Sequence, residues 1–387
     1  IALGVWLAAL AVGRLELRWL RVCSLLDRAE RSFFAICLGL ATISLLMLGL
    51  GLAGQLTRWP LVIILSVAGA FEVWQTIQDR RRSGLSTANL PSRPATRSAK
   101  KNDANDEPGV HWLPWVVLVA VMPFVFCLLL GAMSPQTAFD GIEYHLGGPK
   151  EWFQQGRIVR LPHNVYTSFP FLSEMLLLSG MVLYGDWNSG ALAGQAIIAG
   201  FAPLTALGLY ATGRRWFSAN AGALGALIWL TTPWAYRISI IAYAEGGLAC
   251  YMFASLAVGL RILWFKSDEP RVPEENGSPQ PTLVDVPQGL SLLAGLLAGS
   301  AMACKYTGLI SAVLPGAALI AGAAMREPDR RGKYLLRGLA VFAVGVGLAI
   351  GPWLLKNTLE SGNPVYPWAW SIFGGDGRDA AMNDQGL

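Results

Sequence analysis

Apolar blocks of membrane-spanning length recur along this 387-residue chain, and they constrain its fold more than any other feature. Most run for roughly 18 to 24 residues, the length that an α-helix needs to cross a hydrocarbon core of about 30 Å. The chain is 53% hydrophobic, and its mean hydropathy is +0.44. We therefore expect an all-α polytopic membrane protein with about ten transmembrane helices.

Two polar stretches that contain proline interrupt the apolar blocks. Residues 78–112 are rich in Ser, Pro, Arg and Lys and lack an apolar period, which predicts a disordered cytoplasmic linker. Residues 265–288 form the second polar stretch with prolines, and this composition predicts a second cytoplasmic linker. The predicted organisation is an N-terminal three-span unit (1–77), a main unit (113–370) and an external segment (371–387). Because the chain starts with Ile and stops in a polar stretch, we expect it to be part of a longer one.

The net charge of +5 arises from short Lys/Arg clusters between the apolar blocks. Such clusters mark cytoplasmic loops, so a membrane orientation explains them better than nucleic-acid binding, and no nucleic-acid partner is expected. With the arginine clusters assigned inside, Asp140, Glu143, Glu245 and Lys305 all fall on the opposite side. The five cysteines form no CxxC pair and are interpreted as packing residues.

The apolar segment Phe171–Tyr184 is short for a span and contains Glu174. If it crossed the membrane, the arginines of GRRWF (residues 213–217) would lie outside. We therefore expect this segment to lie in the outer interface, with Ala191–Thr212 crossing inward after it.

The polar loop Gly131–Pro170 follows an apolar block directly and concentrates titratable side chains in a chain that is only 14% charged. Asp140 and Glu143 are three residues apart, so on a helix they would share a face. Such a pair can supply a general base and an orienting or metal-binding carboxylate. The alternative is that both are ordinary acids of a solvated loop.

Two further carboxylates lie where a charge needs a partner. Glu245 stands where an apolar block re-enters the membrane, and Glu174 lies inside the short apolar segment. For Glu174 the partner could be Arg157, Arg160 or His163, or the residue could face lipid headgroups.

Lys305 and Arg237 are expected at the outer ends of spans, where a cation can hold a phosphate. Their alternative role is snorkelling to lipid headgroups. His145 and His163 could ligate a metal with the acids, but their spacing matches no recognised ligand pattern, which favours a structural role. The small residues in Gly289–Gly308 are typical of closely packed membrane helices.

The order of several motifs resembles the GT-C superfamily of membrane glycosyltransferases. The closest type is the protein-mannosyltransferase and aminoarabinose-transferase type, including the bacterial RgtA/B/C/D-like domains. The resemblance covers about Leu113 to Trp370 and leaves residues 1–112 uncovered. It is carried by FDGIEYH after an outward span, Pro170-x-x-x-Glu174, GRRWF, TTPWAYRISIIAYAE, CKYTG at the end of a small-residue span, and NTLESGNPVYPW.

The resemblance implies a GT-C-like catalytic unit whose first external loop is partly helical. Its activity would be inverting transfer of a sugar from a polyprenyl-phosphate donor to a protein, lipid or glycan acceptor. Asp140 matches the position of the catalytic base and Glu245 that of a second external acid. Relatives often have two adjacent acids where this chain has Asp140-Gly141-Ile142-Glu143, so the role of Glu143 stays open.

The resemblance and the outer-loop positions together define the expected site. The expected catalytic residues are Asp140, Glu143 and Glu245. The expected substrate-binding residues are His163, Glu174, Arg237, Lys305 and Tyr306. No cofactor is certain, and Mg²⁺ or Mn²⁺ stays open.

We expect a multi-pass protein of a bacterial inner or plasma membrane, with its site on the extracytoplasmic face of the cell envelope.

Three other classes of protein are alternatives to a glycosyltransferase. The centres of the expected spans carry no charge, which argues against an ion-coupled transporter. A polymerase or ligase of lipid-linked glycans uses similar lipids on the same face, and a non-catalytic scaffold would tolerate replacement of Asp140.

Overall fold

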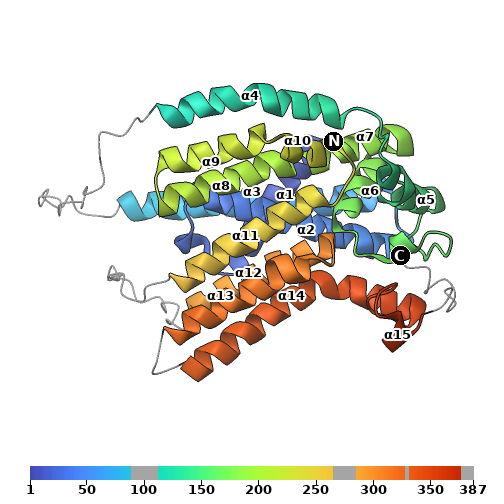
Figure 1. Ribbon diagram of the computed structural model, residues 1–387. Helices are drawn as coiled ribbons and strands as arrows, with labels where there is room; N and C mark the ends of the chain where they lie inside the picture. The colour runs from blue at the N-terminus through green and yellow to red at the C-terminus, as the bar shows by residue number, and fades with distance from the viewer. Residues whose placement is uncertain (89–111, 265–284, 327–330, 376–387) are drawn as a thin grey trace, which may run out of the picture.

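The computed structural model describes residues 1–88, 112–264, 285–326 and 331–375. Within these ranges all regular secondary structure is helical, and no strand occurs. The helices run side by side between two ends of the molecule, with α4 (Leu113–Ala132) along one edge and α14 (Arg331–Ser361) along the other (Figure 1). The predicted all-α class is confirmed.

Six helical stretches are long and apolar enough to span a membrane, which is consistent with an integral membrane protein. They are α2 (Arg28–Leu52), the Arg58–Gln78 part of α3 (Arg58–Ala88), α4, the continuous pair α7 (Trp187–Ala199) and α8 (Phe201–Trp216), α11 (Glu245–Leu263), and the Leu335–Ser361 part of α14. Four shorter apolar stretches accompany them: α6 (Leu172–Tyr184), α9 (Ala219–Thr231), the Gln288–Cys304 part of α12 (Asp285–Cys304), and Leu309–Met325, which comprises η4 (Leu309–Val313) and α13 (Leu314–Met325). The total of about ten spans therefore stays a prediction.

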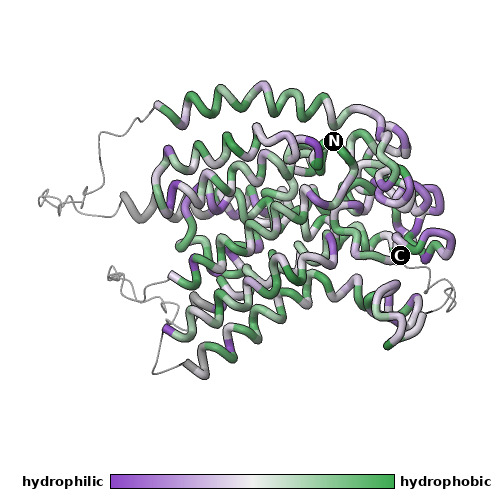
Figure 2. Tube along the Cα trace, viewed as in Figure 1, coloured by the Kyte–Doolittle hydropathy of each residue, from purple (hydrophilic) through white to green (hydrophobic). Residues whose placement is uncertain are grey.

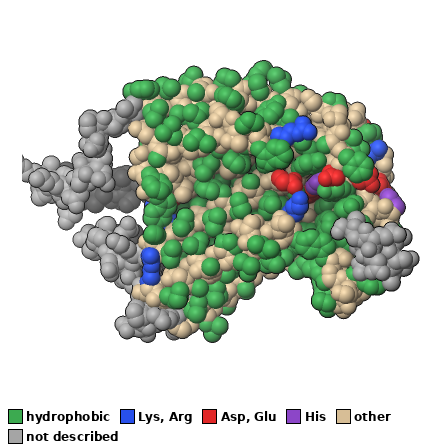
Figure 3. Space-filling model, in the orientation of Figure 1, with side chains coloured by type: hydrophobic (Ala, Val, Ile, Leu, Met, Phe, Trp, Pro, Cys, Tyr) green, Lys and Arg blue, Asp and Glu red, His purple; other side chains and the backbone are tan. Residues whose placement is uncertain are grey.

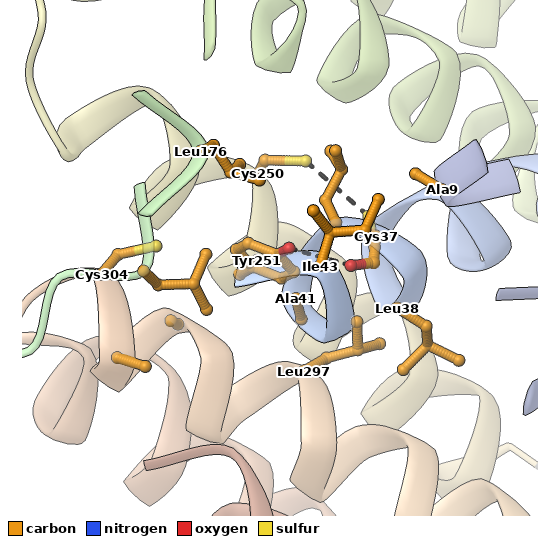
Figure 4. Packing of buried hydrophobic residues seen from close by; sticks show 14 of the residues in the cluster. Ala9, Cys37, Leu38, Ala41, Ile43, Leu176, Cys250, Tyr251, Leu297 and Cys304 are labelled. Atoms are coloured by element: carbon orange, nitrogen blue, oxygen red, sulfur yellow. Dashed lines mark hydrogen bonds between the residues drawn. The ribbon is translucent and has the colours of Figure 1, made fainter. Parts of the chain in front are cut away.

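One hydrophobic core joins the N-terminal helices to the rest of the bundle. α1 (Ala2–Trp19) and α2 contribute to the same buried cluster as α6, α7, α11 and α12. Near its centre the Tyr251 hydroxyl donates to the Cys37 carbonyl at 2.8 Å, and the Cys37 and Cys250 sulfur atoms are 3.9 Å apart (Figure 4). The first two helices thus share a core with the proposed main unit.

A second, smaller core holds α4 against α8 and α9. It contains small and aliphatic side chains, among them Val121, Ala206 and Ala223. The outer face of α4 carries exposed Trp115, Val119 and other large apolar groups. Such exposure is expected for a helix that faces lipid.

Small residues let several helices pack backbone to backbone. A Cβ atom on Gly295 of α12 would collide with the carbonyl of Phe342 on α14, and one on Gly180 of α6 would collide with the backbone of Gly194 on α7. Close approach at small residues is the usual packing mode of membrane helices. The close packing predicted for Gly289–Gly308 is confirmed at Gly295.

The interfacial position of Phe171–Tyr184 stays a prediction, but the structure shows that protein surrounds this segment. Helix α6 is buried in the protein along most of its length, and Met175, Leu176 and Leu178 are fully enclosed. The reason is that α2 packs on one side and the antiparallel α7 on another, so neighbouring helices supply the apolar surroundings that a lipid interface would have supplied.

The apolar block Ala219–Tyr236 does not form one continuous helix. α9 ends at Thr231, and α10 (Pro233–Ile240) begins as a separate helix. Thr232 between them is extended because the ring of Pro233 disfavours the helical conformation of the preceding residue and lacks an N–H.

The first part of the first predicted linker is helical. Helix α3 continues to Ala88, beyond the predicted start of the first linker at residue 78. The remainder of that linker up to residue 111, residues 265–284 of the second, and residues 376–387 lie outside the described residues.

The bundle has two polar ends. At one, which we call the arginine end, Arg214 pairs with Asp27 at 2.6 Å, and Arg215 pairs with Glu30, its Nη2 atom lying 2.7 Å from Oε2. At the other, the loop end, residues 133–171 meet the end of α2, where the Ile158 N–H donates to the Gly51 carbonyl at 2.8 Å, and α5 (Gly147–Gln155) of this loop packs against α6 and α7. Figure 2 shows hydrophilic segments concentrated at the loop end.

Candidate active site at the loop end

Asp140 stands at the start of a short π-helix, η2 (Gly141–His145), that opens the covering loop. The loop before it is anchored by Gln136, whose Nε2 donates to the Ile240 carbonyl at 3.1 Å and bonds to the Gln195 side chain. In a π-helix the hydrogen bonds join residues five apart, so Asp140 aligns with Tyr144 and His145. Asp140 itself is exposed.

His145 and Glu174 form a buried pair beneath Asp140. His145 Nδ1 hydrogen-bonds the carboxylate of Glu174, near the start of α6, and both side chains are almost completely enclosed. The other carboxylate oxygen of Glu174 is buried without a hydrogen-bond partner. In the tautomer whose Nδ1–H donates to the Glu174 carboxylate, Nε2 is the acceptor of the ring.

Glu245 and Lys305 form a second pair beside the first. Glu245 is the first residue of α11, and Lys305 directly follows α12. Their Oε1 and Nζ atoms are 2.8 Å apart, and Glu245 Oε2 is buried without a hydrogen-bond partner. The side chain of Lys305 is half exposed, so it can also meet a ligand.

Two tyrosines connect these groups. The ring centroid of Tyr243 lies 5.2 Å from that of His145, and Tyr144 lies 4.2 Å from His145. Burial raises the pKa of Tyr243, and the charges of Asp140 and Glu245 raise it further, while Arg237 and Lys305 oppose them.

Tyr144 senses the same carboxylates. Burial raises its pKa well above the ordinary value, and the charges of Asp140, Glu174 and Glu245 add to the effect. The charges of Asp140 and Glu245 thus act on both phenols. Figure 3 shows acidic and histidine side chains gathered toward the loop end of a largely apolar surface.

No protein-family model matches this chain, and neither a curated protein nor a solved structure matches it. The resemblance to membrane glycosyltransferases therefore rests on the order of motifs in the sequence.

Three of the expected site residues lie apart from the cluster. The exposed Glu143 contributes its backbone carbonyl to Asn164 at 2.9 Å, and among the described residues its side chain joins none of the groups above. His163 is largely exposed and pairs with Glu151 at 3.1 Å. Tyr306 is buried between Phe169 and Trp368.

The π-helix explains why Glu143 diverges from Asp140. Residues three apart share a face of an α-helix, but the wider turn of a π-helix brings residues four and five apart into line. The expected shared face of Asp140 and Glu143 therefore does not form.

The partner expected for Glu174 is also corrected. Arg160 lies elsewhere, donating to the Glu360 carbonyl at 3.3 Å with its guanidinium over the Tyr366 ring. The partner is His145, to which the sequence reasoning gave only a structural role. The sequence pointed to this pair only because a carboxylate inside an apolar segment, such as Glu174, needs a partner. Nothing in the sequence singled out Tyr243.

The cluster combines an exposed carboxylate, two cations and a buried histidine–carboxylate pair at the end of an apolar bundle. An exposed carboxylate can accept a proton, and Lys305 and Arg237 can stabilise a developing anion. Within the described residues no group of three or more His, Cys, Asp or Glu side chains is placed to hold a metal ion.

Proposed function

We propose that this chain is an integral-membrane glycosyltransferase. It moves a sugar from a polyprenyl-phosphate donor to a hydroxyl acceptor on the extracytoplasmic face, with inversion. The observation that carries the proposal is the arrangement at the loop end of an apolar bundle: Asp140 opens the π-helix that contains His145, and the His145 ring lies 5.2 Å from Tyr243. Two residues after Tyr243, Glu245 pairs with Lys305 at 2.8 Å. A lipid-linked substrate can keep its tail in the bilayer while its phosphate reaches this end.

In the proposed reaction the acceptor oxygen attacks the anomeric carbon of the sugar. Its proton passes to the carboxylate of Asp140. The bond between the anomeric carbon and the phosphate oxygen breaks, and the phosphate leaves with the electron pair. Attack from the face opposite the leaving group inverts the anomeric centre. Because the leaving group is a phosphate, it needs charge neutralisation more than protonation.

Lys305 and Arg237 are the cations proposed to neutralise that phosphate. The hydrogen bond from Lys305 to Glu245 holds the ammonium group at the start of α11. The Lys305 side chain is half exposed, so the ammonium group has further donors for a ligand. Arg237 is exposed on α10, and its charge acts to lower the pKa of Tyr243. Glu245 is thus proposed as the residue that positions Lys305.

The arginine end supports the proposed orientation. Arg214 and Arg215 end α8, and Arg261 lies in the last turn of α11, so these basic groups gather opposite the Asp140 loop. Basic residues at the ends of membrane helices are typical of the cytoplasmic side. The Asp140 loop would then face outward, where lipid-linked sugars serve as donors.

The proposal is tested with purified protein and a panel of polyprenyl phosphates that carry a labelled hexose or pentose. Release of sugar from the lipid is measured with and without EDTA, Mg²⁺ and Mn²⁺. Asp140→Asn keeps the side-chain shape but removes the base, so we expect the rate to fall roughly a hundredfold or more. Glu143→Gln is the matched control, an exposed acid on the same loop that should retain near wild-type activity. Equal rates for wild type and Asp140→Asn would remove the base assignment.

A further inference from the structure

One ring nitrogen of His145 takes no part in holding the loop on the bundle. Nδ1 hydrogen-bonds the Glu174 carboxylate, whereas Nε2 makes no hydrogen bond to any residue that the structure describes. Nε2 is also not among the fully enclosed polar atoms without a partner, so it can be reached from outside the protein. A free nitrogen at the edge of a buried ring is a candidate contact for a ligand.

The Glu174 side chain determines which ring nitrogen is the acceptor. A carboxylate offers only acceptors, so the nitrogen that bonds to it carries the proton. Glu174 is 1% exposed, and among the described residues His145 alone hydrogen-bonds its side chain. The carboxylate charge therefore acts on Nδ1–H, which holds the proton there and makes Nε2 a stronger acceptor.

Aromatic rings limit what can approach the imidazole. The ring centroids of Tyr144, Tyr243 and Phe171 lie 4.2, 5.2 and 6.4 Å from that of His145. The His145 side chain is only 8% exposed, so a small part of the ring is open. A group that meets Nε2 must therefore be small and must donate a hydrogen bond. A hydroxyl group meets both requirements.

His145 is also close to Asp140 along the π-helix η2. Backbone hydrogen bonds of a π-helix join residues five apart, as Leu146 N–H and the Gly141 carbonyl do at 2.9 Å. The same turn brings His145 next to Asp140, the proposed base. A molecule that meets Asp140 is therefore within reach of Nε2.

The geometry points to Nε2 of His145 as the acceptor of a hydrogen bond from one hydroxyl of the donor sugar. This inference rests on the proposed transferase function and adds the residue that selects the sugar. A sugar without that hydroxyl leaves a desolvated acceptor unpaired. Sites that recognise a hydroxyl in this way reject the analogue that lacks it strongly. His145 is thus a specificity-determining residue, and Glu174 holds its tautomer.

Binding of the donor without an acceptor tests the contact. Each labelled polyprenyl-phosphate sugar is compared with its monodeoxy and monodeoxyfluoro analogues in a scintillation proximity assay with the purified full chain. We expect removal of one particular hydroxyl to weaken binding about tenfold or more. Fluorine at the same carbon should not restore binding, because it accepts hydrogen bonds but donates none. Equal binding of all analogues would overturn the proposal and leave Nε2 in contact with water only.

Glu174→Gln tests the role of the tautomer. The amide keeps the shape of the carboxylate but can also donate to Nδ1, which lets the ring carry its proton on Nε2. We expect the preference for hydroxyl over fluorine at that carbon to fall at least about fivefold, a ratio that a purely structural role would not change. Glu151→Gln, at the exposed pair with His163, is the matched control and should bind like the wild type. An unchanged ratio in Glu174→Gln would overturn the assignment to His145.

Sugar release distinguishes this inference from the proposed function. Saturable, hydroxyl-dependent binding without release in the presence of acceptors would support the His145 contact but contradict the transfer step. Release from every deoxy analogue at the rate of its parent would support the transfer step but contradict the contact. Absence of saturable binding by any of the sugar lipids would overturn both.

Discussion

His145 Nδ1 hydrogen-bonds the carboxylate of Glu174, a residue 29 positions further along the chain. The contact ties the π-helix after Asp140 to the buried helix α6, and it places the His145 ring 5.2 Å from Tyr243. This pair therefore fixes the covering loop on the bundle and connects the loop to the start of α11.

Breaking the pair should destabilise the protein. In Glu174→Leu or His145→Leu a buried polar partner is left alone, and we expect a loss of about 3 kcal/mol for each single variant. The double variant removes both polar groups, so its loss should be clearly smaller than the sum. Thermal unfolding in detergent measures all three. Strictly additive losses would show that the two side chains are not coupled.

Asp27 makes stability at the arginine end dependent on pH. Burial acts to raise its pKa, but hydrogen bonds from the Glu30 backbone and from Arg214 outweigh it and lower the pKa below the ordinary value of 3.8. The stabilisation is therefore present above the unfolded-state pKa and is lost as the pH falls through the lowered folded-state pKa.

Asp27→Asn isolates this charge because Asn also caps helices well. We expect the variant to melt below the wild type at pH 7 and the gap to close as the pH falls below 4. Melting curves between pH 3 and 7 provide the measurement. A gap that does not change with pH would assign the effect to packing.

Glu30 should contribute more than an ordinary surface acid. It is nearly buried and receives Arg215 as well as Arg261, whose Nη1 atom lies 3.4 Å away. Glu30→Gln removes the carboxylate charge that both guanidinium groups contact, and we expect a loss of about 2 kcal/mol. Glu151→Gln at the exposed His163 pair is the comparison, and its loss should stay below about 1 kcal/mol. Similar losses would argue against the buried network.

The contact between α12 and α14 depends on the absence of a side chain at Gly295. Gly295→Ala would push a Cβ into the Phe342 carbonyl, and we expect a loss of about 1 to 3 kcal/mol. Gly347→Ala meets nothing within 4 Å and should be neutral or slightly stabilising, since Ala favours helices. Thermal unfolding of the two variants is the measurement. Unaltered stability of Gly295→Ala would show that α12 and α14 can move apart without cost.

The orientation of the bundle is testable by cysteine labelling. In a Cys127→Ser background, Glu143→Cys should react with a membrane-impermeant maleimide in intact cells, because the loop end is proposed to face outward. Phe217, 83% exposed at the arginine end, should react as Phe217→Cys only after permeabilisation. The reverse pattern would place the candidate site in the cytoplasm and contradict the proposed donor.

The helices themselves were largely predictable from the sequence. Each apolar block of sufficient length satisfies its own backbone hydrogen bonds as a helix, so its residues alone define Leu113–Ala132 or Glu245–Leu263 within a few positions. The cause of the break at Thr232 also lies in the local sequence, because Pro233 disfavours the helical conformation of the residue before it. The polar loop and the carboxylates Asp140, Glu174 and Glu245 also stood out, since charge is scarce in this chain.

Tertiary structure alone decided which polar groups meet. Helical periodicity tells which residues share a face, but it does not tell which other helix that face contacts. The pairing of Glu174 with His145 and of Glu245 with Lys305, and the burial of α6 between α2 and α7, depend on how distant segments pack. The π-helix that separates Glu143 from Asp140 is fixed by the contacts of the whole loop, which no local pattern in the sequence encodes.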